Sequence, residues 1–263
     1  MVDLISLAAE YRETFLLVMF RLGSMMAFAP VLGHRSIPLS HRAGLAVLLA
    51  AILTPVLGPA PAPMTDGVRL TLAVAGEIFV GLAIGFIATL VTSAMLVAGE
   101  LIGFEMGLGI AGIYDPTMGQ QLNVVSRFLQ LVALLLFVSV NGHHLLLQAV
   151  ASSFQRVRPG AVLLHPAASS SVVSLGGKLF RSGLELAAPV VAVLFVANVG
   201  LALVARVSPQ MNIFILGVPV TIALGLFGLV EAFPRISQLV SAQLTGMTTD
   251  IAVLVGGGAH GLR

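Results

Sequence analysis

Six ionisable residues lie in or beside long apolar stretches of this sequence. They are Arg21, Glu77, Glu100, Glu105, Arg127 and Glu185. A charge at the centre of a bilayer costs at least about 2.5–3.5 kcal/mol, so such residues face protein, water or a partner charge. One interpretation is an ion or proton pathway. The other, which we favour for Glu77, Arg127 and Glu185, is that they lie near helix ends or pair with one another.

Glu100 and Glu105 differ from the other four because they border a glycine-rich break. For these two carboxylates a water-filled lining is the better interpretation, since charges inside a membrane face water or protein.

The adjacent histidines, His143 and His144, do not predict a metal site. Neighbouring residues on a helix point about 100° apart, no third ligand accompanies them, and paired histidines four residues apart do not occur. A capping or interface role is expected instead. The chain has no Walker glycine loop, no Gly-x-Ser-x-Gly elbow and no cysteine, which excludes disulfides and Cys nucleophiles. We expect no enzyme, no cofactor and no metal.

The surrounding elements are those of a membrane protein. Of the 263 residues, 58% are apolar and only 9% are charged, against roughly 25% charged residues in soluble domains. A spanning helix needs about 20 apolar residues. Five stretches free of Asp, Glu, Lys and Arg meet this length, and a sixth is broken once, by Arg21. They are Ala43–Thr65, Ile78–Gly99, Phe128–Gln155, Leu186–Ala205, Val207–Val230 and, with Arg21 inside it, Thr14–Leu32. The sequence therefore predicts an all-α polytopic membrane protein.

Turn and charge signals divide these stretches further. We expect one hydrophobic domain over residues 1–263, with a frayed tail at about 256–263. The predicted helices lie at about 14–30, 43–57, 69–108 and 124–140, resume at 145–151 after Asn141-Gly142, and continue in two further spans and an amphipathic tail from Pro234. The predicted breaks are a proline linker at 58–63, a loop at 109–123, a polar basic connector at 152–181 and a turn at 206–210.

The ends and the charges exclude two further classes. The net charge of +2 is scattered, so no nucleic-acid partner is expected. Asp3, Glu10 and Glu13 outnumber Arg12 near the start, so no cleavable signal peptide is expected.

Five glycines recur at a spacing of four. Gly99, Gly103 and Gly107 form one series, and Gly81 and Gly85 form another. Small residues at this spacing let helices approach closely inside a membrane, so a packing face is predicted. The alternative is that glycine is simply common in membrane helices.

The loop charges do not give a simple orientation. If the 34–42 loop is cytoplasmic, alternating spans place the acidic 99–123 stretch inside and the basic 156–181 connector outside, against the positive-inside rule. Either one hydrophobic segment is a hairpin that does not cross, or the protein does not sit conventionally in the bilayer.

Two motifs resemble a known family. One runs from Gly99-Glu100-Leu101-Ile102-Gly103 through Tyr114-Asp115-Pro116 to Asn141-Gly142-His143-His144, and the other is Ser208-Pro209-Gln210-Met211-Asn212-Ile213-Phe214 with Gly217-Val218-Pro219. Both are similar to the FliR/SctT family of type III secretion export-gate proteins. The run from Arg35 to Ala46 is closer to the flagellar branch, and the resemblance covers about Phe15 to Phe233.

The resemblance implies a non-enzymatic role in flagellar biogenesis and protein export. Members join FliP and FliQ in a helical assembly of long, bent hairpins in the bacterial inner membrane, at the flagellar basal body. Unfolded flagellar proteins pass through its pore, and FlhB associates with its cytoplasmic side. Such an assembly, lifted partly out of the bilayer, would account for the charge distribution of the loops.

The same resemblance implies site residues. A loop over Met106–Asn123 would fold into the pore as a plug of apolar side chains on flexible glycines, which could block ions by dewetting; the alternative is an ordinary connector. Its residues are Met106, Gly107, Gly109, Ile110, Gly112, Ile113, Tyr114, Asp115, Pro116 and Met118. Helix packing or subunit contact falls to Gly81, Gly85, Gly99, Gly103, Pro209, Gln210, Asn212 and Pro219.

Two positions depart from the family's pattern. Glu105 stands where relatives more often have Gln, and Thr221 where many have Lys, which weakens a basic cytoplasmic contact there. The main alternative function is a small ion- or proton-coupled transporter using Glu77, Glu100, Glu105 and Glu185. Inverted repeats would favour it, and the two halves show no convincing one.

Overall fold

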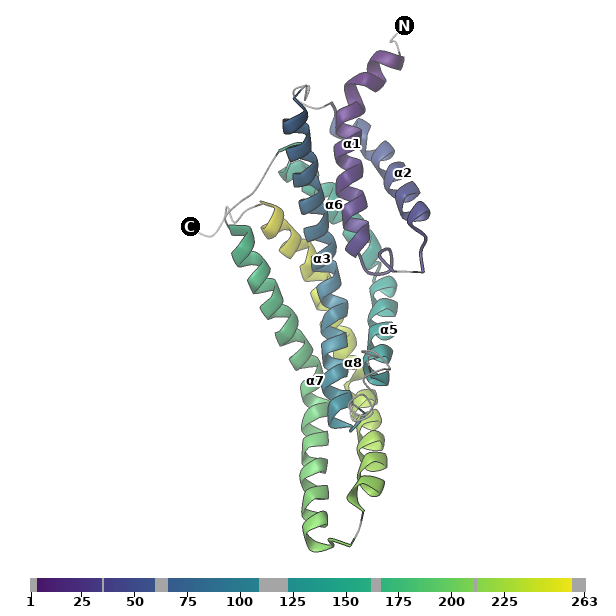
Figure 1. The fold of residues 1–263 in the computed structure, drawn as a ribbon, viewed down its shortest axis with the longest axis vertical. Helices are drawn as coiled ribbons and strands as arrows, with labels where there is room; N and C mark the ends of the chain where they lie inside the picture. The colour runs from purple at the N-terminus through teal and green to yellow at the C-terminus, as the bar shows by residue number, and fades with distance from the viewer. Residues whose placement is uncertain are drawn as a thin grey trace. The chain divides into compact units, whose positions relative to one another are not determined.

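All the regular elements of the described residues are α-helices. The computed structural model describes residues 4–34, 36–59, 66–108, 123–161, 167–210 and 212–256, and no strand occurs within these ranges. The helices are α1 (Leu4–Phe28), α2 (Leu39–Leu57), α3 (Gly67–Glu105), α5 (Val124–Ser139), α6 (Gly142–Arg156), α7 (Ala167–Val207) and α8 (Ile213–Gly256) (Figure 1). The predicted all-α class is confirmed.

Several helices are long and apolar enough to cross a membrane. Among the described residues these are Leu39–Leu57, Gly67–Glu105, Ser174–Val207 and Ile215–Ile251, and α5 with α6 passes the same test as one broken span. The predicted class, a polytopic membrane protein, is confirmed, with four helices of spanning length and apolarity, or five if the bent pair is one span. The predicted sixth stretch corresponds to α1, which is not among these candidates.

Local chemistry explains where the helices begin and end. Gly58, with φ 78°, closes α2, and Pro59 follows it, so the predicted proline break is confirmed at its first residues. Asn123 caps α5 by accepting a hydrogen bond from the Ser126 N–H. Asn141 adopts the left-handed conformation, with φ 56°, between α5 and α6, at the predicted interruption.

The second half of the chain is more helical than the sequence predicts. The connector at 152–181 is mostly helical, because α6 runs to Arg156 and α7 begins at Ala167. Lys178 and Arg181 are exposed on α7, where charge does not oppose the helix. The last span and the amphipathic tail form one helix, α8, with Pro219 and Pro234 inside it; membrane helices tolerate proline where neighbouring groups satisfy the freed carbonyls.

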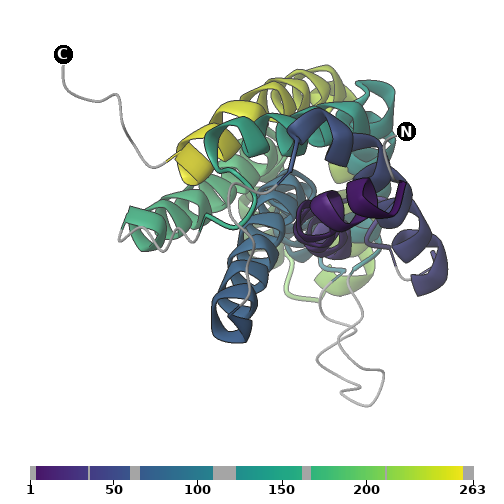
Figure 2. The same cartoon turned by 90° about the horizontal axis from the view of Figure 1, so that it is seen from above.

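The described chain divides into two compact units, and the prediction of one domain stays a prediction. The first unit comprises Met1–Leu90, Asn141–Leu175 and Leu244–Arg263. Its core gathers apolar side chains from α1, α2, the first part of α3, α6 and the end of α8, among them Leu22, Met25, Ile84 and Phe154. Both views show α1 along the first part of α3 (Figures 1 and 2).

The second unit comprises Val91–Val140 and Gly176–Gln243. In it, α7 and the first part of α8 form an antiparallel hairpin joined by residues 208–212 (Figure 1). A Cβ at Gly217 of α8 would lie 3.5 Å from Leu201 Cδ1 of α7, an ordinary van der Waals contact. Many large apolar side chains in this unit are exposed, for example Phe195 (62%), Val196 (70%) and Val230 (70%).

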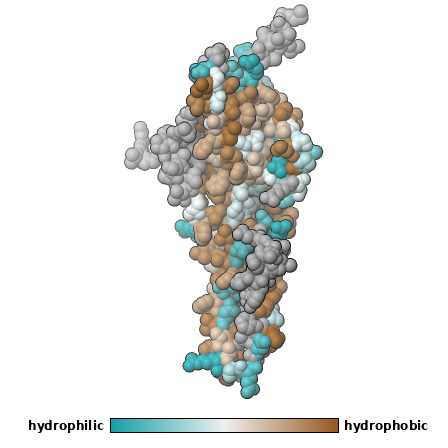
Figure 3. Space-filling model, viewed as in Figure 1, coloured by the Kyte–Doolittle hydropathy of each residue, from teal (hydrophilic) through white to brown (hydrophobic). Residues whose placement is uncertain are grey.

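Apolar side chains also cover much of the face seen in Figure 3. Monomeric soluble proteins do not expose apolar surface on this scale, so lipid or other helices must cover it.

Candidate functional site

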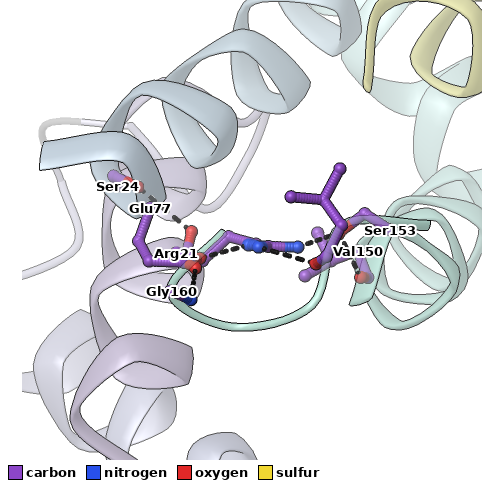
Figure 4. A network of polar contacts seen from close by, with 7 residues as sticks. Arg21, Ser24, Glu77, Val150, Ser153 and Gly160 are labelled. Carbon is purple, nitrogen blue, oxygen red and sulfur yellow. Dashed lines mark hydrogen bonds and ion pairs between the residues drawn. The ribbon is translucent and has the colours of Figure 1, made fainter. Parts of the chain in front are cut away.

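The most buried charged residues of the described chain form an ion pair in the first unit. Arg21 of α1 donates from Nε to Glu77 Oε2 of α3 at 2.5 Å (Figure 4). The two side chains are 0% and 2% exposed. Arg21 and Glu77 therefore pair with each other, as one of the two interpretations of the sequence proposed.

The remaining donors of Arg21 reach α6 and the residue that follows it. Nη1 donates to Ser153 Oγ at 2.9 Å, and Nη2 donates to the Val157 carbonyl at 3.1 Å. The guanidinium also lies over the Phe154 ring, 4.1 Å from its centroid, a favourable cation–π geometry. One side chain of α1 thus joins α3 and the end of α6.

The Glu77 carboxylate is satisfied on both oxygens. Its Oε1 accepts a hydrogen bond from the Gly160 N–H at 2.9 Å, while Oε2 accepts from Arg21. A buried charge pair needs such additional hydrogen bonds to offset the loss of hydration. The arrangement suits a structural junction, because neither oxygen is left for a passing ion.

Gly81 and Gly85 lie against α1. A Cβ at Gly81 would overlap Ser24 Oγ and the Arg21 carbonyl oxygen, and one at Gly85 would lie 2.5 Å from the Met25 carbonyl oxygen. Only glycine permits this approach of two backbones. The neighbours of this glycine series are therefore residues of the same chain.

Gly99 and Gly103 lie against the start of α5 in the second unit. A Cβ at Gly99 would overlap Ser126 Cα, and one at Gly103 would lie 2.5 Å from the Asn123 amide group. Asn123 Nδ2 donates to Glu100 Oε2 at 2.9 Å. The glycines thus make room for the capping residue of α5.

Glu100 and Glu105 have amide partners. Glu100 Oε1 is buried without a hydrogen-bond partner, although Oε2 accepts from Asn123. Glu105 accepts from Asn198 Nδ2 of α7, both at Oε2 (3.1 Å) and at its carbonyl oxygen (3.3 Å). Glu100 Oε1 is therefore a buried carboxylate oxygen left without a hydrogen bond within the described residues.

The predicted plug loop is described only at its ends. Met106 is buried, and its carbonyl oxygen accepts from the Thr221 hydroxyl at 3.0 Å. Gly107 has φ 80°. Gly225 of α8 has no room for a side chain because Met106 fills the space. The other predicted plug residues lie outside the described residues: Gly109, Ile110, Gly112, Ile113, Tyr114, Asp115, Pro116 and Met118.

The remaining predicted charges are exposed. Glu185 accepts from Arg181 one helical turn away at 2.8 Å, and Arg127 is exposed on α5. The rings of His143 and His144 meet edge to face, with centroids 6.1 Å apart. No group of three His, Cys, Asp or Glu residues that could hold a metal gathers within the described ranges.

The second family motif lies at the turn between α7 and α8. Pro209, Gln210 and Asn212 are exposed there, and Pro219 is exposed inside α8. Their predicted contacts with other subunits stay a prediction.

Several polar partners were not identified from the sequence. Ser153, Asn123, Asn198 and Thr221 each satisfy a group on a distant element. Ser, Thr and Asn inside apolar helices commonly bond between helices, so their positions were a usable signal. No sequence signal identifies the Gly160 N–H as a partner, because every residue except proline has a backbone N–H that can donate.

Comparison with known proteins agrees with this architecture. Residues 13–247 match the family described as bacterial export proteins, family 1. Similar proteins include the flagellar biosynthetic protein FliR of Bacillus subtilis, 35% identical over 82% of this chain and 84% of the relative. The FliR of Escherichia coli is 32% identical over 83% and 84%, and that of Aquifex aeolicus is 30% identical over 88% and 90%. Because the family match covers most of the chain, and relatives at least 30% identical cover more than four fifths of it, the chain belongs to family 1 of the bacterial export proteins.

Proposed function

We propose that this chain is a subunit of the flagellar type III protein export gate in the bacterial inner membrane, at the flagellar basal body. It joins FliP and FliQ homologues to form the pore for unfolded flagellar proteins, with an FlhB homologue on the cytoplasmic side. Its role is that of a scaffold and channel part, without catalysis. The similarity to proteins named as flagellar biosynthetic proteins supports this assignment.

The observation that carries the proposal is the apolar surface of the span-length helices. In the apolar windows of α2, α7 and α8 only 17%, 17% and 28% of residues are buried, against 56% in α3. Helices that pack so little within their own chain need lipid or partner helices to cover them. A subunit of a multi-helix gate has this requirement.

Co-expression tests the assembly. With FliP and FliQ homologues the chain should purify as one large complex, whereas alone it should aggregate once detergent is diluted. A monodisperse monomer that transports an ion in liposomes would overturn the proposal in favour of the transporter.

The carboxylates give the alternative function, an ion- or proton-coupled transporter, little support. Glu77 is held by Arg21 and the Gly160 N–H, and Glu185 is exposed beside Arg181. Among the carboxylates of the described residues, only Glu100 has a buried oxygen without a hydrogen-bond partner. A conducting path needs several sites that bind and release an ion.

The plug loop is part of the proposal, and its anchored ends support it. Met106 is fixed by Thr221 on one side, and Asn123 is fixed by Glu100 on the other. Between the two anchors, four glycines (107, 109, 112 and 119) lie among bulky apolar residues such as Ile110, Ile113 and Met118. A segment fixed at both ends can move aside for a passing chain and return.

Leakage measurements test the plug. Ile113→Ser with Met118→Ser keeps the loop length and removes its apolar bulk, so cells should leak small ions while complex yield stays unchanged. Gln120→Ser with Gln121→Ser is the control and should leave permeability normal. Normal permeability in the first variant would refute the plug.

A further inference from the structure

A cavity of about 420 Å³ lies in the first unit, and Phe154, which contacts Arg21, is one of its lining residues. Thr14 of α1, the end of α2 and the residues around the end of α6 line it. Its size falls within the range of small-molecule pockets, roughly 300–1,000 Å³. No acidic side chain is among the described residues that line it.

Two polar groups at this cavity lack partners. Thr14 is 1% exposed, and its hydroxyl has no hydrogen bond. Arg158 also lines the cavity, and its guanidinium makes no hydrogen bond or ion pair with the described part of the chain. A buried hydroxyl left unsatisfied costs free energy, and an unpaired guanidinium is a strong binder of phosphate oxygens. Together they favour a phosphate group.

The end of α2 presents hydrogen-bond acceptors to the cavity, whereas Arg158 and Thr14 present donors. The last carbonyl groups of a helix have no partners within the helix, and Pro59 has no N–H to donate to the Pro55 carbonyl. Gly58 satisfies only the Thr54 carbonyl, at 3.2 Å. The negative end of the helix dipole also favours a cation there. A purely anionic ligand would leave these carbonyls unused.

The cavity also lies at the end of a span, because the candidate span Leu39–Leu57 stops at its wall. Leu48, Ile52 and Val56 are 58%, 57% and 79% exposed and recur every four residues, so they form one apolar stripe that reaches the cavity. This stripe is about 12 Å long at 1.5 Å per residue. An acyl chain could lie along it while its headgroup enters the cavity.

We propose that this cavity binds the headgroup of an aminophospholipid that carries both a phosphate and a primary ammonium. Arg158 and the Thr14 hydroxyl hold the phosphate, the carbonyls at the end of α2 accept from the ammonium, and the Leu48–Val56 stripe holds an acyl chain. The site requires a membrane protein, and it does not depend on the export role.

Lipid titration of the full chain in detergent, followed by native mass spectrometry, tests the headgroup. The probes are phosphatidylethanolamine, phosphatidylcholine and phosphatidylglycerol with identical acyl chains. Phosphatidylethanolamine should bind about tenfold more tightly than phosphatidylcholine, whose methyl groups block the donors. Equal binding of these two lipids, or tighter binding of phosphatidylglycerol, would overturn the assignment.

Variants test the residues. Arg158→Gln should weaken phosphatidylethanolamine binding about tenfold, because a charge-assisted hydrogen bond is lost. Arg156→Gln is the matched control, since Arg156 is exposed nearby but does not line the cavity, and it should bind normally. Equal effects of the two variants would mean nonspecific attraction and overturn the site.

Thr14→Val separates binding from folding. It removes an unsatisfied hydroxyl, so the lipid-free melting temperature should stay the same or rise, while the rise in melting temperature on adding phosphatidylethanolamine should shrink. An unchanged lipid-induced rise would refute the role of Thr14. Soluble glycerophosphoethanolamine should compete only weakly; competition as strong as the lipid's would show a site for a free phosphate ester and overturn the lipid as occupant.

Discussion

Removing Glu77 should destabilise the first unit strongly. The variant Glu77→Leu leaves Arg21, which is 0% exposed, without its counter-charge. Breaking a buried pair by deleting one partner costs about 3–5 kcal/mol. Arg21 keeps its bonds to Ser153 and the Val157 carbonyl and its contact with Phe154. We therefore expect a loss near the lower end, about 3 kcal/mol, from a total stability of roughly 5–15 kcal/mol.

The double variant Arg21→Met with Glu77→Leu tests whether the cost arises from the unpaired charge. It leaves no charge, but the Gly160 N–H and the Val157 carbonyl lose their partners. An unsatisfied buried group costs about 1–3 kcal/mol, so two would cost about 2–6 kcal/mol. Because the Gly160 N–H is only partly buried, the double variant should lose about 3 kcal/mol, near the lower end of that range and no more than the single variant. Independent sites would instead add to about 6 kcal/mol.

Equilibrium unfolding in mixed micelles, with rising dodecyl sulfate and helicity followed by circular dichroism, measures these losses. Glu185→Leu is the control, because it removes a Glu whose ion pair with Arg181 is exposed and contributes little. It should unfold at the wild-type midpoint. The reasoning fails if Glu77→Leu is as mild as this control, or if the double variant shows the additive loss.

Three further substitutions test the packing and the hydrogen bonds by the same unfolding measurement. Gly81→Ala should cost about 1–3 kcal/mol, because its Cβ would overlap the backbone of α1, whereas Gly176→Ala, with open space around it, should not destabilise; equal effects would contradict the close approach. Thr221→Val should cost about 1 kcal/mol through the lost hydrogen bond to the Met106 carbonyl, and no change would show that water replaces it. Asn123→Ala should cost about 1–2 kcal/mol through the lost cap of α5, and a neutral result would show that the cap does not limit stability.

Composition and periodicity predict the helices well here, because a bilayer tolerates few alternatives. The third helix was expected from about Arg69 for about 40 residues and runs over Gly67–Glu105. Asn141 and Gly58 end or interrupt helices as their residue types indicate. The prediction of a connector at 152–181 is wrong over most of its length. Its Lys and Arg side chains lie on an exposed face, and polarity alone does not separate such a helix from a loop.

For the buried charges, the sequence predicts the type of partner that each needs but not which residue supplies it. The high cost of charge in an apolar stretch indicates that Arg21 needs a counter-charge, but not that Glu77, 56 residues away, supplies it. The link between Asn198 and Glu105, 93 residues apart, depends on how α3 and α7 pack in the second unit. Such pairings depend on tertiary structure, because they join residues far apart in the sequence.

The order of synthesis gives the Arg21 junction a further consequence. The ribosome adds about 5–20 residues per second, so Glu77 follows Arg21 by roughly 3–11 s, and Ser153, 132 residues later, by roughly 7–26 s. During the first interval Arg21 has no counter-charge from α3. We therefore expect the nascent α1 to stay at the membrane surface or in the insertion machinery until α3 has been synthesised. The two helices would then enter the bilayer together, with the charges of Arg21 and Glu77 paired.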